Sequence, residues 1–266
     1  MGPDKIDEAV EIYRGMRLEQ RKLDHLPASC TPGDAEEAYK VQNALNLRLV
    51  HSGLGSVSGH KIGCTTKVMQ KYLKIDQPCS GGIYASTVFH ERGERAHALY
   101  CGPGVECEMA IKLGADLGPT GAPYDKDSVA GAVESCMAAI EIVDDRFVDY
   151  GQLEMPTMLA DDFFNAGCVL GVPVRDWQAL DIYSLRGEMS INSKSVGIGF
   201  GRDVMGHPFN VLAWLANSFI QRGKMLHAGE FILTGSLVET HWCDVGDAVR
   251  IEIDGLGSAE MTFAAQ

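Results

Sequence analysis

The pattern of apolar and charged residues divides the chain into a helical beginning and a longer part rich in predicted strands. Residues 4–24 place apolar side chains at helical spacing among many charges. Thr31-Pro32-Gly33-Asp34 has the composition of a helix start, and two acids follow in the first turn, where the helix dipole favours them. The next helix has one buried stripe over residues 38–49. We therefore predict an N-terminal helical segment over residues 1–53.

From residue 54 to residue 266, short apolar runs between glycines predict a β-rich catalytic domain. Alternating polar and apolar residues over 187–201 predict a hairpin. Three helices are expected in this domain: a short one capped by Thr65-Thr66, one from Asp127-Ser128 through residue 140 and one that begins at His207-Pro208. The last strand is expected over residues 249–253.

Two carboxylates interrupt the apolar, strand-like run over residues 105–111. Because side chains alternate along a strand, Glu106 and Glu108 should face one side, while Cys107 and Met109 face a core on the other. Two adjacent anions on one face repel each other, and Mg²⁺ or Mn²⁺ would suit their oxygens. A solvated outer face of an edge strand is the other interpretation of the same pattern.

A third carboxylate, Glu141, lies between Ile140, Ile142 and Val143 in a second apolar run. A charge in such a place is costly to bury without a partner, and no adjacent residue supplies a cation. Together with Glu106 and Glu108, Glu141 would make a three-carboxylate metal site.

Two further groups could bind a substrate or transfer a proton to it. Lys61 stands between Gly59 and Gly63 in a small, apolar segment, where a lowered pKa would let it transfer protons. An exposed lysine at a strand end is the alternative. Thr234 and the backbone at Gly235 end a buried strand and could hold a carboxylate, although an ordinary strand end has the same pattern.

Composition narrows the class of protein. The formal net charge of −13 opposes sequence-independent binding to nucleic acid, which requires many Lys and Arg contacts to phosphate. The eight cysteines include no C-x-x-C pair and predict buried thiols in a reducing compartment. There is no apolar region typical of a signal peptide and no run of membrane-spanning length, so we expect a cytoplasmic protein without a membrane partner.

Several short motifs occur in order along nearly the whole chain. They are Gly59-His60-Lys61-Ile62-Gly63, Asp76-Gln77-Pro78, residues 105–111 and 139–146, Gly206-His207-Pro208, Ala228-Gly229-Glu230, Leu233-Thr234-Gly235 and Gly255-Leu256-Gly257-Ser258. In this set the chain resembles the 2-keto-4-pentenoate (2-hydroxypenta-2,4-dienoate) hydratases and the related 4-oxalocrotonate decarboxylases of the fumarylacetoacetase superfamily.

The resemblance implies an α+β fold with a mixed β-sheet roll, an N-terminal helical segment and a homo-oligomer. It implies Mg²⁺ or Mn²⁺ at the three glutamates, Lys61 in the active site, and a small 2-hydroxy-dienoate or 2-oxo-enoate as substrate. Thr234 and the neighbouring backbone of Gly235 would bind the substrate carboxylate. Asp162 and Asn165, with Asp161 beside them, lie where the family has further polar residues of the active site.

One place departs from the family pattern. An acidic residue that pairs with the lysine usually follows Asp-Gln-Pro, and here Cys79-Ser80-Gly81 occupies that place. Either Asp76 takes over as the catalytic partner of Lys61 or the proton relay differs.

The activity implied is that of a metal-dependent hydro-lyase. Lys61 moves the proton that ketonises the dienol at C5, and water then adds at C4 to give a 4-hydroxy-2-oxo acid. The nearest alternative is decarboxylation of a 2-oxo-dioate such as 4-oxalocrotonate, for which Arg146, Arg202 or Lys194 would have to bind a second carboxylate. A third is a non-catalytic subunit that accompanies a decarboxylase partner, and a C–C hydrolase is the least favoured.

Overall fold

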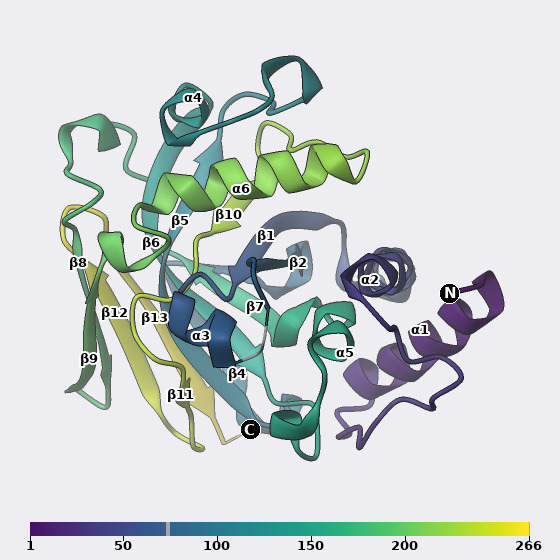
Figure 1. The fold of residues 1–266 in the computed structure, drawn as a ribbon. Coiled ribbons are helices and arrows are strands. Elements are labelled where there is room, and N and C mark those ends of the chain that lie inside the picture. Colours follow the sequence, from purple (N-terminus) through teal and green to yellow (C-terminus); the bar gives the residue numbers. More distant parts are fainter. Residues whose placement is uncertain (73–74, 266) are drawn as a thin grey trace.

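The computed structural model describes residues 1–72 and 75–265 (Figure 1). Its helices are α1 (Pro3–Leu18), α2 (Ala35–Leu49), α3 (Lys67–Tyr72), α4 (Lys126–Ala130), α5 (Met155–Ala160) and α6 (Pro208–Gln221). Its strands are β1 (Val57–Gly63), β2 (Cys79–Tyr84), β3 (Val88–His90), β4 (Arg92–Ala96), β5 (Pro103–Leu113), β6 (Val133–Asp144), β7 (Asn165–Leu170), β8 (Arg186–Ile191), β9 (Lys194–Phe200), β10 (Phe231–Leu233), β11 (His241–Trp242), β12 (Ala248–Ile253) and β13 (Gly257–Ala264).

The strands form one mixed sheet in the order β2-β1-β10-β5-β6-β7-β3-β4-β13-β12-β8-β9, with β11 paired to β5. Three neighbouring pairs, β1–β10, β3–β7 and β4–β13, are parallel, and the other pairs are antiparallel. The expected mixed sheet with an N-terminal helical segment is therefore confirmed. No helix among the residues described is long and apolar enough to cross a membrane.

The N-terminal helices form a pair at one side of the sheet, next to α5 (Figure 1). The predicted start of α2 is confirmed, because the Asp34 side chain caps the helix by accepting a hydrogen bond from the Glu37 N–H. The first helix ends at Leu18 and not near residue 24, since the chain turns at Gln20, which has a φ of 47°. Buried residues of both helices share a core with Cys64, Tyr84 and Phe147 of the sheet part.

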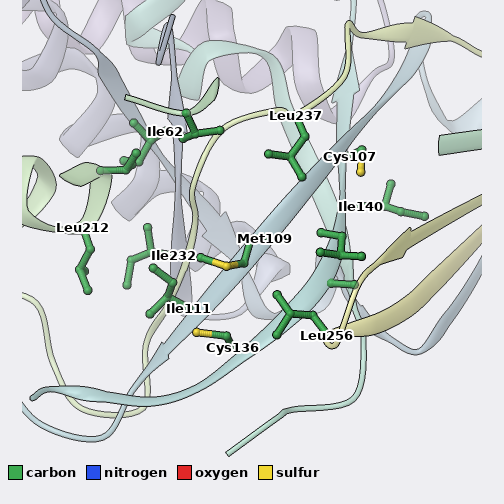
Figure 2. Packing of buried hydrophobic residues seen from close by; sticks show 14 of the residues in the cluster. Ile62, Cys107, Met109, Ile111, Cys136, Ile140, Leu212, Ile232, Leu237 and Leu256 are labelled. Carbon is green, nitrogen blue, oxygen red and sulfur yellow. The ribbon is translucent and has the colours of Figure 1, made fainter. Parts of the chain in front are cut away.

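The main core lies between the sheet and α6, which crosses it (Figure 1). Cys107, Met109 and Ile111 of β5 project into this core together with Leu212 of α6, as Figure 2 shows. The predicted inward orientation of Cys107 and Met109 is thus confirmed. The start of α6 at His207-Pro208 is confirmed as well, because the His207 ring caps the helix. All eight cysteines are free thiols.

Two predictions of secondary structure are wrong. The helix expected over residues 127–140 is the short helix α4 followed by strand β6, and the capping residue is Asp125. Nearly every residue of β6 is buried, whichever face of the sheet its side chain points to. The apolar run is therefore almost continuous, and part of it matches a helical spacing by chance. The strand over 249–253 is not the last, because β13 follows it and pairs with it.

Candidate metal centre and active site

The three predicted carboxylates come together where β5 and β6 pair. The antiparallel register sets Glu106 opposite Glu141, and Glu108 points to the same face two residues further along β5. One oxygen from each of the three lies within 4.8 Å of the others. Glu108 and Glu141 are fully buried, whereas Glu106 is half-buried and accepts a hydrogen bond from the Thr240 hydroxyl. No pattern in the sequence predicts this contact of Thr240.

Each buried carboxylate has one oxygen in a hydrogen bond and one without a partner. The Gly235 N–H donates to Oε2 of Glu108 at 2.7 Å, and the Asn165 amide donates to Oε1 of Glu141 at 3.0 Å. Oε1 of Glu108 and Oε2 of Glu141 have no hydrogen-bond partner among the described residues, although both are buried. Buried anionic oxygens need a partner, and two that converge with a third carboxylate fit a divalent cation with a preference for oxygen.

Lys61 supplies the positive charge that the strand sequences lack. Its Nζ lies 3.1 Å from Oε1 of Glu141, and its side chain is only 3% exposed. Burial lowers the pKa of Lys61, but the negative charges of Glu141, Glu106 and Glu108 raise it by a larger amount. The pKa of Lys61 therefore lies above its ordinary value. Neither the lowered pKa nor the exposed position considered for Lys61 is found, because the side chain is buried and the acids outweigh burial, which favours the ammonium form.

Burial and neighbouring charges also shift the pKa values of the carboxylates. Burial, followed by the charges of Glu141 and Glu106, raises the pKa of Glu108 well above its usual range. Burial also raises the pKa of Glu141, against the lowering effect of Lys61. If all three carboxylates are ionised, they and the Lys61 ammonium carry a net charge of −2, which a divalent cation would neutralise.

Two side chains border Lys61 besides the acids. The ring of Phe163 lies 5.1 Å from its Nζ, in cation–π range. Cys79, at the place of the expected acid, is buried 3.9 Å from the Cys64 sulfur, and burial raises the pKa of the Cys79 thiol well above its ordinary value. Asp76 is exposed in a bend before β2, and a catalytic role for it stays a prediction.

The residues predicted to bind substrate have partners inside the protein. The Thr234 hydroxyl donates to the Met109 carbonyl at 3.0 Å, and Gly235 adopts a φ of 101° beside Thr65. Asp162 is fully buried and accepts a hydrogen bond from the Gly82 N–H. Of the predicted set, Gly235 and Asn165 lie closest to the reacting centre, since each donates to a glutamate of the metal site.

The cations considered for a second carboxylate are either paired inside the protein or exposed. Arg146 is buried and donates to Asp161 at 2.8 Å. Arg202 is exposed and stacks on the Phe200 ring at 4.1 Å. Lys194 is exposed at the start of β9.

Comparison with known families assigns the chain to one of them. Residues 87–264, more than half of the 266 residues, match the model of the fumarylacetoacetate (FAA) hydrolase C-terminal domain. The chain belongs to this family, as the resemblance implied. The matched region contains all three glutamates, whereas Lys61 and the helices α1 and α2 precede it.

Within the family, the chain is similar to hydratases over nearly its whole length. It is 32% identical to the 2-keto-4-pentenoate hydratase of Burkholderia vietnamiensis over 246 residues, 91% of each chain. It is 33% identical to the 2-hydroxyhexa-2,4-dienoate hydratase of Comamonas testosteroni, over 95% of this chain and 94% of that protein. Its fold matches that of 4-oxalocrotonate decarboxylase from Pseudomonas putida G7, solved with magnesium and adipate, with a TM-score of 0.92 at 23% identity over 99% and 98% of the two chains.

Proposed function

We propose that the chain is a metal-dependent hydratase. It adds water to a 2-hydroxy-2,4-dienoate, one keto tautomer of which is a 2-oxo-4-enoate, and produces a 4-hydroxy-2-oxo acid in the meta-cleavage degradation of aromatic compounds. The observation that carries the proposal is the buried triad of glutamates with two unpartnered oxygens beside the Lys61 ammonium. The similarity to two hydratases over more than nine-tenths of the chain supports the choice of reaction.

The triad and the lysine divide the chemistry. Glu106, Glu108 and Glu141 hold Mg²⁺ or Mn²⁺, which when bound acts as a Lewis acid on the substrate's C2 oxygen. Because Lys61 is an ammonium group, it acts first as a proton donor, to C5 of the dienol. The proton lost from the C2 hydroxyl returns to the lysine, so Lys61 is unchanged by the tautomerisation. The resulting 2-oxo-3-enoate is conjugated through C4, which then accepts water while C3 takes a proton.

Positions of the surrounding groups are consistent with these roles. Asn165 and Gly235 fix one oxygen of Glu141 and one of Glu108, which leaves the other oxygen of each free for the cation. The Phe163 ring covers Lys61 on one side and keeps bulk water from its Nζ.

The test is a substrate panel assayed for both dienol absorbance and CO₂ release. The purified full chain, with Mg²⁺ or Mn²⁺, should consume 2-hydroxypenta-2,4-dienoate or 2-hydroxyhexa-2,4-dienoate without releasing CO₂. Release of CO₂ from 4-oxalocrotonate would assign the decarboxylase reaction in its place. Binding of metal without turnover of any compound would favour the non-catalytic partner subunit. Intact turnover by Glu106→Gln would refute the metal site itself.

The remaining expectations belong to the same proposal. A homo-oligomer in the cytoplasm, able to associate with a decarboxylase, follows from the family resemblance. Light scattering of the purified chain, alone and mixed with such a partner, tests both kinds of association.

A further inference from the structure

An unusual backbone turn joins the metal centre to the N-terminal helix α1. Asp162, Phe163 and Phe164 have φ values of 50°, 49° and 67°, so three consecutive residues other than glycine lie in the left-handed region. Single residues of this kind are uncommon, and they persist only where the surroundings hold them. The turn directly precedes β7, whose first residue is Asn165.

Buried polar contacts hold the Asp162 side chain in place. Its carboxylate accepts hydrogen bonds from the Gly82 N–H at 2.9 Å, from the Tyr84 hydroxyl at 3.1 Å and from Nη2 of Arg17 at 3.0 Å. Arg17 also forms an ion pair through Nε with Asp161, the residue before the turn. One guanidinium from α1 therefore bridges the two acids, and Arg146 supplies a second cation to Asp161.

The other end of the turn delivers two side chains to the catalytic groups. Phe163 sets its ring 5.1 Å from Nζ of Lys61, and Asn165 donates to Oε1 of Glu141 at 3.0 Å. The ring packs closely against β1, since a Cβ on Gly63 would lie 2.9 Å from it. A change in the conformation of the turn would therefore alter the surroundings of both Lys61 and Glu141.

We propose that Arg17 is a positioning residue for the metal centre. By binding Asp161 and Asp162 at once, it holds the left-handed turn that places Phe163 on Lys61 and Asn165 on Glu141. The inference rests on the proposed function, because it takes Lys61 and the triad as the reacting groups.

The geometry requires arginine and not merely a positive charge. Arg17 uses two nitrogens of a rigid, planar group, Nε toward Asp161 and Nη2 toward Asp162. Lysine carries one nitrogen on a flexible stem and cannot reproduce this fork. Arg17→Lys therefore keeps the charge and loosens the turn.

The experiment compares Arg17→Lys with a control on the same helix. Tyr13→Phe removes a buried hydrogen bond from α1 to the Thr157 carbonyl, 2.8 Å long, and removes no charge and no hydrogen bond to the turn. Mn²⁺ affinity is measured from the electron paramagnetic resonance signal of free Mn²⁺, and kcat and KM are measured with the dienoate. Arg17→Lys should weaken Mn²⁺ binding about tenfold, the size typical of groups that orient a metal ligand, and should lower kcat more than it raises KM. Tyr13→Phe should match the wild type in both.

Two further variants separate positioning from folding. Phe163→Leu should lower kcat with Mn²⁺ affinity unchanged, and its effect on kcat should not add to that of Arg17→Lys, because both act on Lys61 through one turn. Tyr84→Phe removes one donor to Asp162 and no charge, so it should weaken Mn²⁺ binding in the same direction about twofold even if Arg17→Lys does not fold.

Wild-type Mn²⁺ affinity in both Arg17→Lys and Tyr84→Phe would overturn the proposal. An equal loss of affinity in Tyr13→Phe would do the same, since it would reveal a general effect of loosening α1. Mn²⁺ affinity does not depend on turnover. A wild-type chain that binds Mn²⁺ but does not hydrate the dienoate would refute the proposed function and leave the role of Arg17 testable.

Discussion

Replacing Glu108 by glutamine should have opposite effects on stability with and without metal. Glu108 is fully buried, its Oε2 accepts the Gly235 N–H, and its Oε1 has no hydrogen-bond partner among the described residues. Glutamine has nearly the same shape, keeps an acceptor for Gly235 and removes one negative charge from the triad. It also adds an amide that can donate to Glu106 or Glu141.

Without metal, Glu108→Gln should stabilise the protein. Two unit charges at the 4.8 Å limit of the cluster repel by about 3 kcal/mol if the effective dielectric constant is about 20. Protonation already relieves part of this repulsion, since the pKa of Glu108 is raised. We expect a gain of about 1–3 kcal/mol, and each kcal/mol shifts the Tm of a chain of this size by about 2–4 °C.

With metal, the order should reverse. At a Mn²⁺ concentration of about 100 times Kd, binding stabilises the wild type by about 2.7 kcal/mol, or roughly 5–10 °C in Tm. Glu108→Gln loses a charged ligand, and we expect its affinity to fall by about a hundredfold or more. At the same Mn²⁺ concentration its Tm should hardly move.

The assay is thermal unfolding followed by circular dichroism, in EDTA and across a MnCl₂ series. The matched control is Glu134→Gln, which changes an acid on the same strand as Glu141 that pairs with Lys112 and Arg175. The control should keep the full metal-induced rise in Tm. A Glu108→Gln protein that is less stable than the wild type in EDTA, or that retains the full rise with Mn²⁺, would refute the electrostatic reasoning.

Three other outcomes follow from the site and its supports. Lys61→Met should lower kcat by about 10²–10⁴, the range for loss of a proton-transfer group, while Mn²⁺ binding detected by paramagnetic resonance persists. Gly235→Ala should cost about 1–3 kcal/mol in urea unfolding, because φ is 101° and the new Cβ would lie 2.5 Å from Oγ1 of Thr65. Burial lowers the pKa of His207, whose Nδ1 accepts the Phe209 N–H as a helix cap. The unfolded chain therefore takes up its proton first as pH falls, so the stability due to His207 should be complete above about pH 6.5 and lost below it. In His207→Ala, the urea midpoint of unfolding should therefore depend less on pH between about pH 5 and 7 than it does in the wild type.

Strand periodicity made the metal ligands predictable. Glu106 and Glu108 are expected on one face because side chains alternate along a strand. Glu141 needs a cation as partner because its neighbours in sequence are apolar. The sequence could not say that Glu141 lies directly across from Glu106, since register depends on how β5 and β6 pair. Their shared need for a cation suggested that the three form one site, and the family resemblance implied the same set.

Apolar periodicity failed where a strand is buried on both faces. Residues 133–140 repeat apolar side chains at intervals that suit a helix, but the whole of β6 is nearly continuous in apolar residues. A run of this kind has no polar face to reveal its period, so pattern alone cannot separate strand from helix.

The contacts of Arg17 could not be read from the sequence. It stands among other charges on α1, and 144 residues separate it from Asp161. A charged residue on an amphipathic helix is usually solvated, and nothing local distinguishes one that is buried. The direction of the pKa shift of Lys61 could not be predicted for a related reason, because it depends on acids that β5 and β6 bring close to the lysine.

The choice between hydration and decarboxylation depends on what lies beyond the triad. Both reactions need an electrophilic site for the 2-oxo acid, which a metal at the proposed glutamate triad, beside Lys61, would provide equally well for either. A 2-oxo-dioate has a second carboxylate, which requires a cation at the far end of its site. Among Arg146, Arg202 and Lys194, Arg146 is nearest in sequence to the triad, yet Asp161 binds its Nε at 2.8 Å and Asp144 lies 3.9 Å from its Nη1. Because freeing Arg146 would leave Asp161 buried with one counter-charge fewer, the site favours a substrate with a single carboxylate.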